Sequence, residues 1–109
     1  MSSEHISGYL HHPKCIEDFN HLYTTTINLV ELLGMEILDP PKIIREEEPL
    51  TGNSVFCVIK TSHLAFHFME NPEQTSRFTI DSCKLFDKQA VIKFLEQAYK
   101  CKVEIKSVY

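Results

Sequence analysis

The sequence predicts an α+β protein, a two-layer sandwich in which a mostly antiparallel sheet carries two helices on one face. Apolar residues recur at helical spacing between positions 16 and 33 and between positions 91 and 98, and they alternate with polar residues in several other segments. The resulting order is strand, helix, three or four strands, helix, strand, which favours both helices on one side of a single sheet. A length of 109 residues fits one domain over 1–109, and a homodimer interface would help so short a chain to be stable.

The first half of the chain is predicted to contain one helix between two short strands. Residues 5–10 are predicted to be a strand, Pro13 to open a helix, and Gly34 to end it. Residues 35–38 are predicted to be a second strand, followed by a charged, exposed segment over 42–48. The apolar face of the helix is expected to comprise Ile16, Phe19, Leu22, Tyr23, Ile27, Val30 and Leu33.

The middle of the chain is predicted to supply the centre of the sheet. After a turn over 49–53, the apolar run 55–59 has the length of a buried strand. Residues 64–68 alternate between apolar and polar side chains, and so do residues 77–81, which predicts two further strands. The segment 71–74 between them is predicted to be a loop.

The end of the chain is predicted to form the second helix and a last strand. Asp87 is expected to cap the helix, with Phe86 and Val91 placed as a hydrophobic staple across the cap. Residues 102–108 are expected to form the final strand. The buried stripe of the helix is expected to comprise Val91, Phe94, Leu95 and Ala98.

The charge of the chain argues against nucleic acid as a partner. The formal net charge is −4, and the 11 basic residues are dispersed rather than clustered as phosphate binding requires. A cationic small molecule is easier to accept. Because the N-terminus has no basic stretch before an apolar run, and no window approaches 18 apolar residues, we expect a cytoplasmic protein without membrane contact.

Metal and disulfide sites have little support in the sequence. No Cys-x-x-Cys pair occurs, and Cys15, Cys57 and Cys101 are expected to be small core residues in a reducing compartment. On a strand, His63 and His67 would lie about 13 Å apart, too far for one zinc ion. We therefore predict no metal site, and we interpret His11 and His12 as loop residues rather than ligands. The acidic run Glu46-Glu47-Glu48 is interpreted as a solvated segment rather than a site that attracts a cationic substrate.

Ser54, Ser62, His67 and Cys83 together form the pattern most suggestive of chemistry. Alternation places His67 opposite Leu64 and Phe66, and Cys83 opposite Phe78 and Ile80, so a site is expected on the sheet face away from the helices. Conversion of an internal serine to a ketone needs a hydroxyl, support for an oxyanion and a base. Ser62, Ser54 and His67 have the side chains for these three roles, in that order, and we expect the groups to converge around one peptide bond.

The spacing of these residues resembles that of the short prokaryotic class of S-adenosylmethionine decarboxylase proenzymes, which depend on a pyruvoyl group. The resemblance is specific from Ser54 to His67 and at Cys83. It implies that Ser62 attacks Thr61, that the chain is cleaved between them, and that a pyruvoyl cofactor derived from Ser62 remains at the start of 62–109. It further implies that Ser54 and His67 serve the cleavage.

The resemblance also implies how the mature protein acts. The pyruvoyl ketone would form a Schiff base with the amine of S-adenosylmethionine, arginine or ornithine and promote loss of carbon dioxide, a step of polyamine synthesis, while Cys83 returns a proton. The chain departs from the family pattern at Thr61, where Glu is usual, and at Phe68-Met69-Glu70, where an aromatic-Pro-Glu stretch is frequent. Two alternatives stay open: an uncleaved homologue that acts as a binding or regulatory subunit, and an unrelated interaction domain with accidental matches.

Overall fold

Six strands form one sheet in the order β2-β3-β4-β5-β1-β6, and all paired neighbours run antiparallel. The structure is a computed structural model that describes residues 4–47, 49, 51–71 and 76–108. In chain order its elements are β1 (Glu4–His11), α1 (Phe19–Leu32), β2 (Lys42–Glu46), β3 (Thr51–Ile59), β4 (Ser62–Asn71), β5 (Ser76–Ser82), α2 (Lys88–Tyr99) and β6 (Lys102–Val108).

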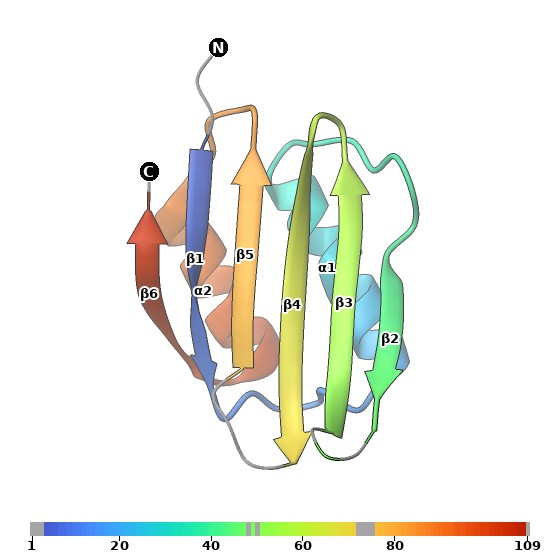
Figure 1. Ribbon diagram of the computed structural model, residues 1–109. Helices are drawn as coiled ribbons and strands as arrows, with labels where there is room; N and C mark the ends of the chain where they lie inside the picture. The colour runs from blue at the N-terminus through green and yellow to red at the C-terminus, as the bar shows by residue number, and fades with distance from the viewer. Residues whose placement is uncertain (1–3, 48, 50, 72–75, 109) are drawn as a thin grey trace.

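Both helices lie on the same side of the sheet, α1 behind β3 and β4 and α2 behind β1 and β5 (Figure 1). The predicted two-layer α+β sandwich is therefore confirmed. Its core fills the space between the layers with side chains from both, among them Leu22, Leu29, Phe66, Ile80 and Leu95. We call the other side of the sheet, which carries no helix, the open face. No helix in the described part of the chain combines the length and the hydrophobicity needed to cross a membrane.

Helix α1 begins at Phe19, six residues later than predicted. The Asp18 side chain accepts a hydrogen bond from the backbone N–H of His21, which fixes the N-cap there. Before the cap, His12 and Cys15 have φ angles of 55° and 62°, which a right-handed helix does not allow. Phe19 and Tyr23 are exposed rather than buried, and Thr25 and Thr26 occupy the buried face instead.

The chain after α1 differs from the prediction in two places. Gly34 ends the helix with a φ of 69°, as expected. The predicted strand 35–38 is reduced to one isolated bridge between Ile37 and Ile59, because β2 occupies the rest of that edge of β3. Residues 42–46 are mostly exposed, as predicted, but they form the edge strand β2, and Ile43 packs against the core.

The predicted turn over 49–53 is too long, because β3 already starts at Thr51. Strand β4 passes so close at Gly52 that an added Cβ would lie 2.0 Å from the carbonyl oxygen of Phe68. Glycine is needed here for the strands to pair, not for a turn. Asn53 is buried in the strand, and its side-chain amide donates to the carbonyl oxygen of Ile16 at 2.8 Å.

The later elements follow the predicted pattern. Strands β4 and β5 alternate as expected, and Asp87 caps α2 by accepting a hydrogen bond from the backbone N–H of Ala90. Apart from Asn71 at the end of β4, the predicted loop 71–74 lies outside the described residues. The prediction for the cysteines holds for Cys57, which is fully buried, and in part for Cys101, which is half-buried and packs against the core. It is wrong for Cys15, which lies on the irregular loop before α1 and is exposed.

Candidate active site

The turn between β3 and β4 contains the predicted cleavage point. Ile59 pairs with Ser62, so Lys60 and Thr61 form a two-residue connection. Thr61 has a φ of 61°, in the left-handed region that disfavours β-branched residues. The peptide bond between Thr61 and Ser62 therefore follows a strained residue, at one end of the sheet.

Cys83 lies directly against this turn, although it belongs to a different part of the chain. Strand β5 ends at Ser82, and the next backbone N–H, that of Cys83, donates to Ser62 Oγ at 2.8 Å. The Cys83 thiol contacts the Thr61 hydroxyl and lies 3.8 Å from the Lys60 carbonyl oxygen. The structure thus brings Ser62 and Cys83 together across the ends of β4 and β5.

A cavity of about 380 Å³ adjoins the turn and the thiol. Its charged side chains are Lys60, Lys84 and Glu36, and the Lys84 ammonium donates to the Gly34 carbonyl oxygen at 3.0 Å. One wall is formed by Gly34, Met35 and Glu36, which the sequence does not predict, because nothing local links the end of α1 to Cys83. The cavity is lined by Gly34, Met35, Glu36, Lys60, Thr61, Cys83 and Lys84.

Ser54 and His67 form a second pair on the open face. They are register partners on β3 and β4, and Ser54 Oγ lies 2.9 Å from His67 Nδ1. The Ser54 hydroxyl also donates to a carboxylate oxygen of Glu46 on β2, at 3.1 Å. Two adjacent strand pairings, β2 with β3 and β3 with β4, therefore position the imidazole.

The expected convergence of all four residues does not occur within one chain. His67 follows Ser62 by five residues on a continuous strand, which at about 3.3 Å per residue puts them roughly 16 Å apart. Because the two positions are an odd number of residues apart, their side chains also point to opposite faces of the sheet. Ser54 and His67 lie on the open face. Cys83 was expected on that face too, but it lies with Ser62 at the end of the sheet, beside the residues that follow α1.

The open face also holds a polar network that the sequence analysis missed. Asp81 accepts from His5 Nδ1 at 2.7 Å and lies 3.4 Å from His63 Nε2, across the paired strands β1, β5 and β4. His63 stacks on Phe56 with 5.9 Å between ring centroids. Within the described residues, no three His, Cys, Asp or Glu side chains are grouped to hold a metal ion.

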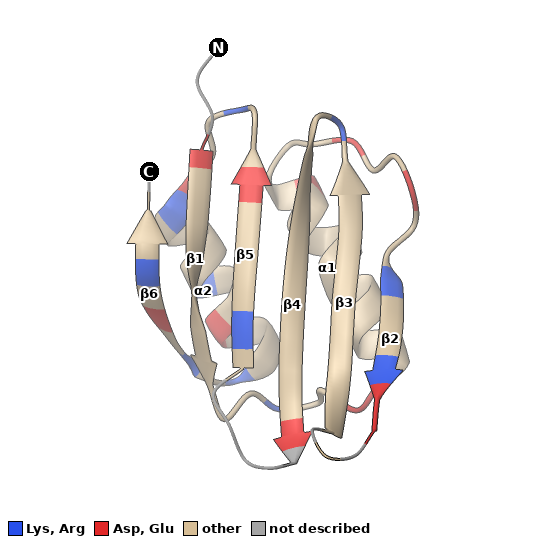
Figure 2. Cartoon of the chain, in the orientation of Figure 1, with Lys and Arg blue, Asp and Glu red and all other residues tan. Residues whose placement is uncertain are grey.

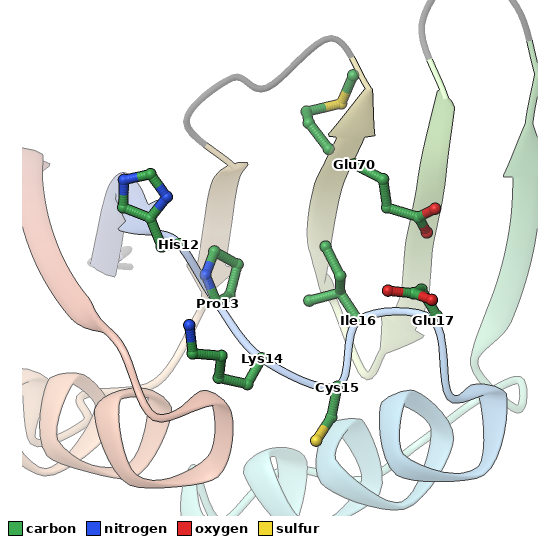
Figure 3. Close-up of a pocket in the computed structure, with 8 residues that line it drawn as sticks. His12, Pro13, Lys14, Cys15, Ile16, Glu17 and Glu70 are labelled. Atoms are coloured by element: carbon green, nitrogen blue, oxygen red, sulfur yellow. The ribbon is translucent and has the colours of Figure 1, made fainter.

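A second cavity of about 380 Å³ lies at the far end of β4 from Ser62. Figure 3 shows its polar lining, with Lys14 and Glu17 on the loop before α1 and Glu70 on β4. The carboxylate of Glu70 is held by the Arg45 guanidinium, a hydrogen bond that raises the pKa of Arg45 above its ordinary value. None of the residues predicted to act in cleavage or catalysis lines this cavity.

The protein is thus a small α+β sandwich in which a serine and a cysteine are paired beside a cavity. The family model for S-adenosylmethionine decarboxylase matches residues 5–108 of the 109, and the chain belongs to that family. No curated protein matches the chain. Membership supports a function of the S-adenosylmethionine decarboxylase type and overturns the alternative of an unrelated interaction domain.

Proposed function

We propose that this protein cleaves itself between Thr61 and Ser62 and then decarboxylates S-adenosylmethionine, or a related cationic amino acid, with the pyruvoyl group formed from Ser62. The observation that carries the proposal is the hydrogen bond of 2.8 Å from the Cys83 backbone N–H to Ser62 Oγ, beside a cavity of about 380 Å³. Family membership over residues 5–108 supports the same chemistry.

Cleavage begins at the hydroxyl of Ser62. Its oxygen accepts from the Cys83 N–H, which holds it at the scissile peptide and leaves its proton free to be removed. Ser62 Oγ attacks the Thr61 carbonyl carbon, the peptide bond breaks, and an ester forms. Loss of the Ser62 Cα proton expels the Thr61 carboxylate, and one water then replaces one ammonia to leave the ketone.

The conformation of Thr61 favours this reaction. A β-branched residue at a φ of 61° raises the free energy of the uncleaved turn, by about 1–2 kcal/mol for the left-handed conformation. Conversion of the peptide to an ester releases the constraint. Thr61 departs from the Glu that is usual in the family, yet it places strain where the bond must break.

We assign the base to His67 of a second copy of the chain. Within one chain His67 cannot reach Ser62, but the open face that carries it is suited to self-association. Ile44, Phe56 and Val58 there are 59%, 42% and 36% exposed. Figure 2 shows almost no charge along β3 and β4, where Glu70 is the only acidic residue and none is Lys or Arg.

A two-fold axis near the middle of β4 relates the two halves of the site. Residues 62 and 67 are equidistant from such an axis, so the partner subunit's His67 would lie opposite the Ser62 end of β4. The homodimer then contains two complete sites, each built from both chains. It also covers the exposed apolar residues of the open face.

The residues at the turn fit a pyruvoyl group, because position 62 has a backbone donor beside it and the cavity adjoins it. When formed, the group supplies an electrophilic ketone that serves as the electron sink for decarboxylation. Cys83 borders the cavity and returns a proton to the substrate carbon. Lys60 and Lys84 attract the substrate carboxylate, and Glu36 attracts its cationic part.

Two departures from the family pattern favour a second function, that of an uncleaved binding or regulatory subunit. Thr61 replaces the family's usual Glu, and Phe68-Met69-Glu70 replaces its aromatic-Pro-Glu stretch. This homologue would keep the cavity and the dimer but would remain a single intact chain.

Mixing two inactive variants tests the proposal, including its shared site. Ser62→Ala cannot cleave but still presents His67, whereas His67→Ala keeps Ser62 and lacks the base. Neither should cleave alone, but in the refolded mixture the His67→Ala chain should split at Thr61-Ser62. Intact His67→Ala chains in a mixture shown to contain heterodimers would refute the shared site, and splitting of His67→Ala alone would refute the base.

The substrate is tested on cleaved wild-type protein. Release of carbon dioxide is compared for S-adenosylmethionine, arginine and ornithine, and Cys83→Ala serves as a variant that should cleave normally but turn over slowly. Full turnover in Cys83→Ala would remove its role as proton donor. No release from any of the three amino acids by cleaved protein would refute the substrate class.

A further inference from the structure

We infer that Glu46 is a positioning residue for His67: it fixes which ring nitrogen carries the proton and so prepares the other nitrogen as the base. This inference rests on the proposed role of His67 in cleavage. Nothing in the sequence pattern assigned Glu46 a role beyond a solvated charge, and the inference comes from two hydrogen bonds that share one hydroxyl group.

The number of protons available at Ser54 decides which group donates in each hydrogen bond. The Ser54 hydroxyl has one proton, and two groups lie within hydrogen-bond distance of its oxygen: a Glu46 carboxylate oxygen at 3.1 Å and His67 Nδ1 at 2.9 Å. An ionised carboxylate only accepts, so the serine proton goes to Glu46. The Ser54 oxygen is then the acceptor in the second bond, and His67 Nδ1 must donate.

This count selects one neutral form of the imidazole. With the proton on Nδ1, His67 Nε2 carries a free lone pair, which is what a general base requires. Without the Glu46 carboxylate, the Ser54 hydroxyl is free to donate to Nδ1, and the proton then moves to Nε2. That form has no lone pair at Nε2 to take the Ser62 Cα proton.

Glu46 also compensates the charge that develops during the reaction. When Nε2 accepts the Cα proton, His67 becomes an imidazolium that donates to Ser54, and Ser54 donates to the carboxylate. Arg77 occupies the position paired with His67 on the other side, on β5, and its cation opposes that imidazolium. The Glu46 carboxylate lies on the opposite side of His67 from Arg77, and its negative charge offsets the positive charge of Arg77. The imidazolium is therefore stabilised without any proton transfer through Ser54 to Glu46.

Nitrogen-15 NMR of the histidine rings tests the inference independently of activity. The parent is the uncleavable Ser62→Ala protein, in which the resonances of His67 are assigned by their loss in His67→Gln. We expect the pattern of an Nδ1-protonated ring in the parent and in Glu46→Gln, whose amide oxygen still accepts. In Glu46→Ala we expect a shift toward the Nε2-protonated form. Glu47→Ala is the matched control, because the Glu47 carboxylate lies near the Arg45 guanidinium instead.

Cleavage of the otherwise wild-type chain provides the second readout. Glu46→Ala should slow it about tenfold to a hundredfold, the effect of one lost hydrogen bond to a charged group. Glu46→Gln should recover much of the rate, and Glu47→Ala should match the wild type. An Nε2-protonated ring in the parent, or a ring unchanged by Glu46→Ala, would overturn the inference. If Glu46→Ala shifts the tautomer but leaves the cleavage rate unchanged, the inference about Glu46 holds. The assignment of His67 as the base, which belongs to the proposed function, is then wrong.

Discussion

The strain at Thr61 gives a prediction with a defined size. Thr61→Gly and Thr61→Ala both remove the hydroxyl that contacts Cys83, but only Gly removes the Cβ that disfavours a φ of 61°. A Cβ in the left-handed region costs about 1–2 kcal/mol, and the greater freedom of unfolded glycine returns about 0.4–1 kcal/mol. In the uncleavable Ser62→Ala background, the Gly variant should therefore be more stable than the Ala variant by about 0.5–1 kcal/mol.

The same comparison in the cleavable chain measures how much strain the reaction releases. If the transition state has lost the full cost of about 1–2 kcal/mol, Thr61→Ala should cleave about 5 to 30 times faster than Thr61→Gly. The assay is a time course of a pulse-synthesised chain, stopped in detergent and separated by size. Equal cleavage rates, together with the expected difference in stability, would show that strain at Thr61 does not contribute to the reaction.

Further variants test the fold and its dependence on pH. Gly52→Ala should destabilise the protein by about 1–3 kcal/mol in urea unfolding, because the new Cβ meets the Phe68 carbonyl oxygen and both strands must move; an unchanged midpoint would contradict the close approach of β3 and β4. Asp87→Ala should cost about 1 kcal/mol through loss of the α2 cap, whereas Asp87→Asn, which still accepts, should cost less. Burial raises the pKa of the Cys101 thiol from 9.0 to about 11. The folded protein therefore holds this proton more tightly than the unfolded chain, and the resulting contribution to the free energy of unfolding is complete below pH 9 and is lost as the pH rises to 11. Stability should decline over that interval, and Cys101→Ala should decline less steeply; parallel curves for the two proteins would remove Cys101 as the cause.

The parts of the fold that the sequence predicted are those with a strong local signal. The alternation of Leu64, Phe66 and Phe68 marks the buried side of β4, and Asp87 marks the start of α2 by its own hydrogen bond. The edge strand β2 has no such signal, because its side chains are mostly exposed and only pairing with β3 makes it a strand. The late start of α1 depends on Asp18 and on an irregular loop, neither of which interrupts helical spacing.

The candidate site could be predicted as a set of residues but not as an arrangement. Ser62 and His67 are close in sequence, but a strand rises about 3.3 Å per residue, so five residues place them far apart. The same rise is the reason why His63 and His67 are not expected to share a metal ion. The contact between Ser62 and Cys83 depends on the register of β4 with β5, and the hydrogen bond from Ser54 to Glu46 depends on that of β2 with β3. Register is a tertiary property, which side-chain spacing within one segment does not determine.

The most direct test of self-cleavage is the intact mass of freshly purified wild-type protein under denaturing conditions. We expect two chains, and the first is residues 1–61 with an ordinary carboxyl end. The second is residues 62–109, lighter by the mass of one ammonia molecule than the same fragment with an N-terminal serine. Its N-terminus should be blocked and should gain two hydrogens on borohydride reduction. A single stable mass for the whole 109-residue chain, unchanged by incubation, would contradict the account and favour the uncleaved subunit.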